Sequence, residues 1–114
     1  KMVLRENSAE LIHERMKYVS RKLSLQNKST ESISDELMGI AHLLNEHIDL
    51  IRSSVSQSEY VSEDDYEEID EIRTILNAID DIEIALSEGD SHYQLQIRIN
   101  DEIDVLEKVT KLSR

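Results

Sequence analysis

The sequence contains no cysteine, no proline, no tryptophan and no phenylalanine, and it has only two glycines. Without cysteine the chain forms neither disulfide bonds nor thiolate metal sites. Because few residues interrupt helices, long helices with short connections are expected. Tyrosine is the one aromatic residue type, with four copies, so a core has to be built mainly from Ile, Leu, Val and Met.

Long apolar runs are also missing. No stretch approaches the ~20 apolar residues that a membrane-spanning helix needs. The first five residues, Lys1 to Arg5, include no apolar run long enough for a signal peptide. We therefore expect a cytoplasmic or otherwise intracellular protein, with no membrane insertion in this segment. The chain opens on lysine rather than methionine, which is typical of a tagged chain or of a piece of a longer protein.

Apolar residues recur at steps of three and four, which is typical of helices that bury one face. The 114 residues are enough for one domain and too few for two, so residues 1–114 are expected to form a single domain. The pattern predicts an all-α fold, an up-down antiparallel four-helix bundle with helices over about 8–26, 31–56, 63–87 and 91–112. One bent helix through residues 27–30 is an alternative to the first break. The residues expected in the core include Leu37, Leu44, Ile72, Leu76, Ile79, Ile99 and Ile103.

Several residues suit helix ends. Asn7 and Glu10 have the spacing of a capping box and predict the start of the first helix. Ser62 precedes an acidic first turn, which suits the positive end of a helix dipole. Gly89 suits the left-handed turn that ends the third helix. Gly39, inside the second predicted helix, marks either a close approach of another backbone or a cost of ~1 kcal/mol relative to alanine.

The formal net charge of −12 argues against nucleic acid or an anionic membrane as a direct partner. Residues 1–28 carry a net charge of +4, whereas residues 59–83 carry −10, so the first predicted helix is basic and the third is acidic. These two helices lie on a diagonal of a simple bundle, so their charges are not expected to be neighbours within one chain. Either both faces are solvated, or they meet across a homodimer, or the basic face binds an acidic partner. The candidate partner-binding residues are Arg15, Arg21, Lys22, Glu63, Asp64, Glu67, Glu68 and Glu71.

The crowded acids between Asp64 and Glu71 also predict how stability responds to the solvent. Like charges repel one another at short range, and salt screens that repulsion. We therefore expect stability to rise with moderate salt and with mild acidification.

The histidines do not form a convincing metal site. Glu10 and His13 have the Glu-x-x-His spacing of di-iron bundles, but such a site needs the motif twice. Both residues lie off the apolar stripe of the first helix, which indicates a solvated pair. His42 and Glu46 are four residues apart and can share a helix face. His47 lies on the stripe of the second helix, which is typical of a neutral, hydrogen-bonded core histidine. We expect neither a metal nor another cofactor.

Two short segments resemble known helical families. His13, Arg15 and Lys17 resemble the His-x-Arg-x-Lys part of some sensor-kinase dimerisation helices, which implies an exposed phosphoaccepting histidine. Residues 30–47 are similar to the opening heptads of SNARE motifs of the endoplasmic-reticulum retrieval type. That likeness implies a vesicle-fusion or tethering helix, and the match consists of Ser34, residues 36–40 and the apolar layers that follow.

No catalytic motif or phosphate-binding loop is recognisable in the sequence. We therefore expect a non-enzymatic helical-bundle module for protein–protein interaction, such as an adaptor, an inhibitor or an assembly subunit, with an acidic face on its third helix. The alternatives are a histidine phosphotransfer or dimerisation bundle and a SNARE-like or tether-like trafficking domain. A further alternative is an acidic mimic of nucleic acid, in which residues 59–83 would occupy a basic DNA-binding cleft.

Overall fold

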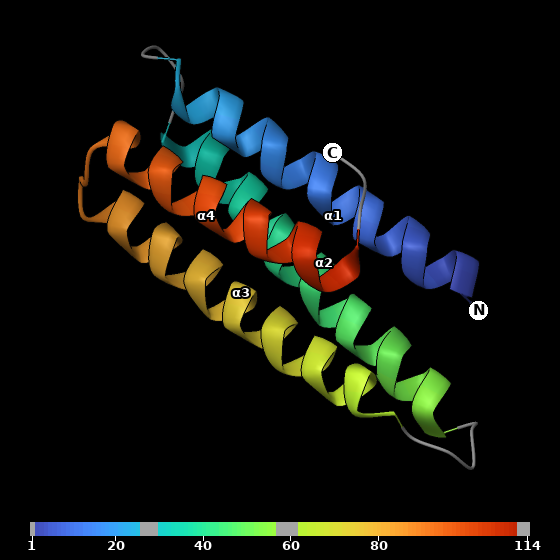
Figure 1. The fold of residues 1–114 in the computed structure, drawn as a ribbon. Coiled ribbons are helices and arrows are strands. Elements are labelled where there is room, and N and C mark those ends of the chain that lie inside the picture. Colours follow the sequence, from blue (N-terminus) through green and yellow to red (C-terminus); the bar gives the residue numbers. More distant parts are fainter. Residues whose placement is uncertain (1, 26–29, 57–61, 112–114) are drawn as a thin grey trace.

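The computed structural model describes residues 2–25, 30–56 and 62–111, and the side chains of residues 5–25, 30–53 and 62–111. These residues form four helices, as predicted: α1 (Met2–Leu23), α2 (Thr30–Ser56), α3 (Glu63–Ser87) and α4 (His92–Thr110). The helices run side by side in an elongated bundle with principal extents of 50, 26 and 18 Å (Figure 1). The all-α four-helix bundle is thereby confirmed.

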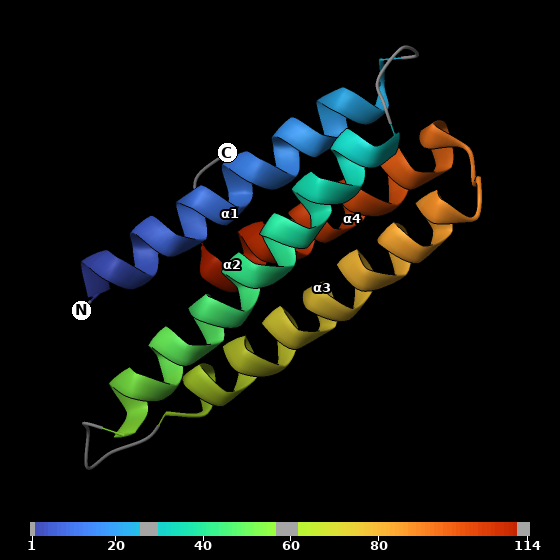
Figure 2. The same ribbon diagram turned by 180° about the vertical axis from the view of Figure 1, so that it is seen from behind.

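Each helix packs against two others. Both α1 and α3 pack on α2 and on α4, so α1 and α3 occupy diagonal corners, as expected (Figures 1 and 2). The side chains of Lys22 and Ser32 meet at one end of α1, and those of Ser8 and His47 meet near the other. The first two helices are therefore separate and antiparallel, and the alternative of one bent helix is wrong.

The boundaries of α2 and α3 agree with the predicted ones to within one residue, whereas α1 differs at both ends and α4 ends two residues early. α2, α3 and α4 begin within one residue of the predicted positions, whereas α1 begins at Met2 rather than at residue 8. Asn7 and Glu10 consequently lie inside the helix and do not cap it. Contacts of Arg5 and Ser8 with other helices hold these early turns on the bundle, and such contacts outweigh a local capping signal. The predicted ends at residues 26 and 112 are wrong, because α1 already ends at Leu23 and α4 at Thr110, before the described residues Leu25 and Lys111.

The connection between α3 and α4 is fixed by local hydrogen bonds. Gly89 has a φ of 90°, and its N–H donates to the carbonyl of Leu86, while the N–H of Asp90 donates to the carbonyl of Ala85. These two bonds form a Schellman motif, so the predicted glycine cap is confirmed. The hydroxyl oxygen of Ser62 accepts from the N–H of Asp65, as predicted for the cap of α3.

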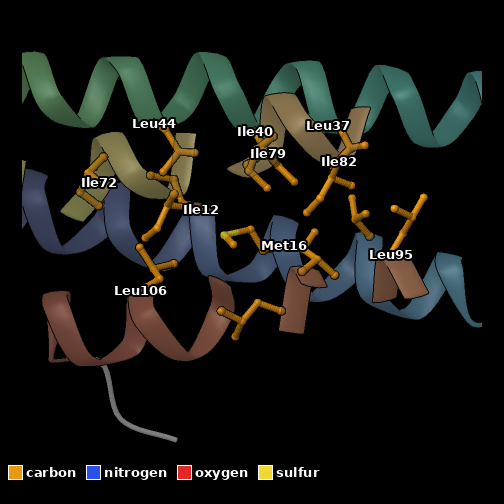
Figure 3. Close-up of a cluster of buried hydrophobic side chains, with 14 of the residues drawn as sticks. Ile12, Met16, Leu37, Ile40, Leu44, Ile72, Ile79, Ile82, Leu95 and Leu106 are labelled. Carbon is orange, nitrogen blue, oxygen red and sulfur yellow. The ribbon is translucent and has the colours of Figure 1, made fainter. Parts of the chain in front are cut away.

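A cluster of aliphatic side chains from all four helices forms the core, and Figure 3 shows part of it. Six of the seven residues expected there are buried, and Leu76 is half-buried. Ile75 is fully buried instead, because the inward stripe of α3 runs through Ile72, Ile75 and Ile79. Of the two methionines whose side chains are described, Met16 is fully buried among the isoleucines and leucines and Met38 is exposed.

Candidate functional site

Among the described residues, one end of the bundle contains three helices, because α4 (His92–Thr110) is the shortest of the four. Nε2 of His13 lies 2.8 Å from Oε2 of Glu107, which fixes how α4 lies along α1. α4 ends at Thr110, three residues after Glu107. Arg5 lies eight residues before His13, or about 12 Å along α1 at the usual helical rise. The first turns of α1 therefore extend past the end of α4 (Figure 2).

A polar network occupies this three-helix end, and we name it the Arg5 cluster: Arg5, Ser8, His47, Asp65 and Glu68. The guanidinium of Arg5 donates to Oδ1 of Asp65 at 3.1 Å and to Oε1 of Glu68 at 2.7 Å. Nε2 of His47 lies 2.9 Å from the other oxygen of Glu68, and its Nδ1 lies 3.0 Å from the Ser8 hydroxyl. The expectation that α1 and α3 do not exchange charges within one chain is therefore wrong at this end.

The Arg5 cluster ties three helices together. The predicted core histidine is confirmed, since the His47 side chain is 1% exposed and both ring nitrogens have partners. A histidine–carboxylate pair suits proton transfer when a substrate reaches it. Here burial separates the imidazole from solvent, and Glu68 is shared with Arg5. These contacts join α1, α2 and α3.

His13 is buried, contrary to the expectation of a solvated pair with Glu10. Its side chain is 11% exposed and is paired with Glu107 of α4. Beside it, the Ser20 hydroxyl donates to Oδ1 of Asn100 at 2.6 Å. α4 covers this flank of α1, so the buried surface is wider than the central apolar stripe. Among the residues that the structure describes, no group of three or more His, Asp or Glu side chains is arranged to hold a metal ion.

The predicted acidic residues of α3 separate into two groups. Glu63, Asp64 and Glu67 are exposed and make no ion pair with any described residue. Glu68 belongs to the Arg5 cluster, and Glu71 is half-buried near Glu102 of α4. The expected effect of salt and mild acid stays a prediction, but Arg5 already relieves part of the crowding.

The predicted basic residues of α1 face α2 or solvent. Nη1 of Arg15 lies 3.6 Å from Oε2 of Glu36 on α2. Nζ of Lys22 donates to the Ser32 hydroxyl at 3.0 Å and lies 4.8 Å from the ring centroid of Tyr18. Arg21 is exposed. None of the three basic residues meets the acidic face of α3 within the chain.

Glu102 of α4 is a half-buried carboxylate near Glu71 of α3. Its Oε1 is buried and accepts no hydrogen bond. Burial raises the pKa of Glu102 above its usual value, the charges of Asp101 and Glu71 raise it further, and Arg98 opposes them. The charged form therefore destabilises the fold at neutral pH.

Glu102→Gln is expected to stabilise the fold slightly at pH 7, because the amide carries no buried charge. A raised folded pKa means that the folded chain binds the proton more tightly than the unfolded chain. Wild-type stability should therefore rise as pH falls through the folded pKa, and that gain is complete below the ordinary pKa of glutamate. The advantage of the variant should shrink over the same range in urea titrations. Asp104→Asn, at an exposed position of the same helix, is the control, and an equal effect of both variants would contradict the assignment.

A shallow depression of about 410 Å³ lies between the end of α1 and the start of α4, lined by Leu23, Ser24, His92, Tyr93 and Gln96. Of the helices in the described ranges, none has the length and apolar character that crossing a bilayer requires. No known family matches this sequence, and neither a curated protein nor a solved structure matches it.

Proposed function

We propose that the chain is a non-enzymatic helical module that binds a basic protein partner through the exposed acidic face of α3. The observation that carries this proposal is the group of Glu63, Asp64 and Glu67, which have no ion-pair partner among the described residues. Tyr66 lies among them with 59% of its surface exposed. Lysine and arginine side chains would pair with these carboxylates and stack on the ring.

The contacts of the buried histidines support the same function. The two buried histidines, His13 and His47, each form a hydrogen bond with a glutamate of another helix. Their contacts are used to hold helices, which leaves the outer faces as the surfaces for recognition. Binding through exposed charges would be fast and sensitive to salt.

The alternative functions gain less support. A phosphoaccepting histidine needs an accessible imidazole, whereas His13 is buried against Glu107. A SNARE-like helix offers its apolar layers to other chains, whereas Ile33, Leu37 and Leu44 are buried in this chain's own core. Mimicry of nucleic acid would use the same exposed acids as the proposed function, with a basic DNA-binding cleft as the partner.

The proposal also includes self-association of the chain, because exposed charges of both signs lie on one molecule. It also includes an intracellular location, which rests on composition. In a closed dimer built on these charges, α1 of each copy would contact α3 of the other copy. The diagonal placement of α1 and α3 disfavours such a dimer, because one flat face of the bundle holds only adjacent helices. Contact of α1 with α3 of another copy would instead continue as an open chain.

Replacing Glu63, Asp64 and Glu67 together with Gln, Asn and Gln is expected to abolish partner binding and leave the fold intact. A photoreactive phenylalanine analogue at Tyr66 would capture proteins in native extract, for identification by mass spectrometry. The matched control is Asp80→Asn with Asp81→Asn, which removes two exposed charges farther along the same helix. The proposal predicts basic proteins that are captured by the parent and by the control and lost from the triple variant. Capture of the same proteins by all three would contradict it.

A further inference from the structure

The face formed by α1 and α2 carries exposed apolar side chains around an ion pair. Arg15 of α1 and Glu36 of α2 meet at 3.6 Å. Leu11 lies about one turn before Arg15 and is 46% exposed, and Tyr18 lies about one turn after it and is 40% exposed. Gly39 lies one turn beyond Glu36, on α2. We name these five residues the α1–α2 face.

Two features of the α1–α2 face concern Gly39 and Glu36. A Cβ atom placed on Gly39 would meet no atom within 4 Å, although glycine is among the weakest helix formers. No described neighbour therefore requires a glycine there. Oε2 of Glu36 is buried and accepts no hydrogen bond, since the contact with Arg15 is too long for one. A close approach by another chain would fill the open space at Gly39, whereas Oε2 of Glu36 has no exposed surface and stays beside Arg15.

Charges beside the α1–α2 face are complementary to the same face of a second copy. Arg21 of α1 is exposed, as are Glu31 and Asp35 of α2, and none of the three forms an ion pair with a described residue. Lys22 and Ser32 are in contact, so Arg21 lies at about the height of these two acids along the bundle. A two-fold axis parallel to the helices keeps these heights and sets α1 of each copy opposite α2 of the other.

We propose that two copies of the chain associate through the α1–α2 face about such an axis, with α1 of each copy packed over Gly39 of the other. Arg21 of each copy then faces Asp35 and Glu31 of its partner, twice over. The adjacent corners of α1 and α2 make this contact closed, which the diagonal corners of α1 and α3 do not allow. The inference rests on the self-association part of the proposed function and is independent of what binds α3.

The first test is a substitution at Gly39 that is expected to affect the dimer and the stability of the fold in opposite directions. Gly39→Leu is expected to raise the melting temperature, because leucine favours helix and meets open space within the chain. The same change fills the docking position, so the dimer should weaken by at least about tenfold in sedimentation equilibrium near ~50 µM. Asn45→Leu, at an exposed position elsewhere on α2, is the control and should leave the dimer intact. A monomeric wild type, or a dimer unchanged by Gly39→Leu, overturns the proposal.

The second test is an exchange of charges between copies. Arg21→Glu alone and Asp35→Arg alone should each weaken the dimer, and the double variant should restore it. A dimer that weakens in both single variants without recovery in the double variant overturns the arrangement about this axis. The triple change at Glu63, Asp64 and Glu67 should leave the dimer intact, which distinguishes failure of this inference from failure of the α3 proposal.

Discussion

Ile79→Ala is expected to lower the free energy of unfolding by about 2–5 kcal/mol. Ile79 is 1% exposed and lies in the middle of α3, where it packs in the aliphatic cluster with side chains of the other helices (Figure 3). Truncation removes apolar contact area and leaves a cavity that the surrounding helices fill only in part. A domain of this size has about 5–15 kcal/mol of stability in all, so this one change removes a large share.

The control for this prediction is another isoleucine of the same helix. Ile84 is 56% exposed, so Ile84→Ala removes the same atoms with little loss of buried area. Its expected effect is within about 0.5 kcal/mol. Urea unfolding followed by circular dichroism measures both variants, and equal effects at the two positions would show that the inward stripe of α3 is misplaced.

Glu68→Ala is expected to destabilise the fold by about 2–4 kcal/mol, because it breaks the Arg5 cluster. The substitution leaves Nε2 of His47, whose side chain is 1% exposed, without its partner. It also removes one of the two carboxylates that pair with Arg5. The side chains of Arg5 and Glu68 keep some contact with solvent, which lowers the expected cost relative to a fully buried pair.

Glu67→Ala is the matched control, since Glu67 is the neighbouring glutamate and faces solvent. Its expected change is within about 0.5 kcal/mol. Combining Glu68→Ala with Arg5→Met completes a double-mutant cycle, in which the two effects should not add because the residues are in contact. Additive effects, or equal effects of Glu67→Ala and Glu68→Ala, would refute the assigned contact.

The sequence predicted α3 and its connection to α4 best, for a local reason. Ser62 and Gly89 act through hydrogen bonds to residues three to five positions away, so their signals need no knowledge of the rest of the fold. The start of α1 was the largest error, because local capping signals at Asn7 were outweighed by contacts with distant helices.

Tertiary structure decides which of the predicted site residues face solvent and which join helices. Glu67 and Glu68 are adjacent in the sequence, yet one faces solvent and the other joins three helices. A helix turns by 100° per residue, so the side chains of neighbouring residues point in different directions. Predicting which of the two is buried requires knowing where the core lies. Arg5 was missed although it lies four residues before the buried Ala9, a spacing that continues the inward stripe of α1.

Composition and periodicity determined that this chain forms long helices around an aliphatic core, because both follow from residue types and from spacings of three and four. Only the tertiary structure decided where α4 lies along α1, with the first turns of α1 beyond Thr110. That offset leaves room for Arg5 to reach Asp65 and Glu68 across the diagonal of the bundle. The position of one helix along another depends on contacts such as that of His13 with Glu107. These two residues are far apart in the sequence, and no local pattern around either one predicts the other.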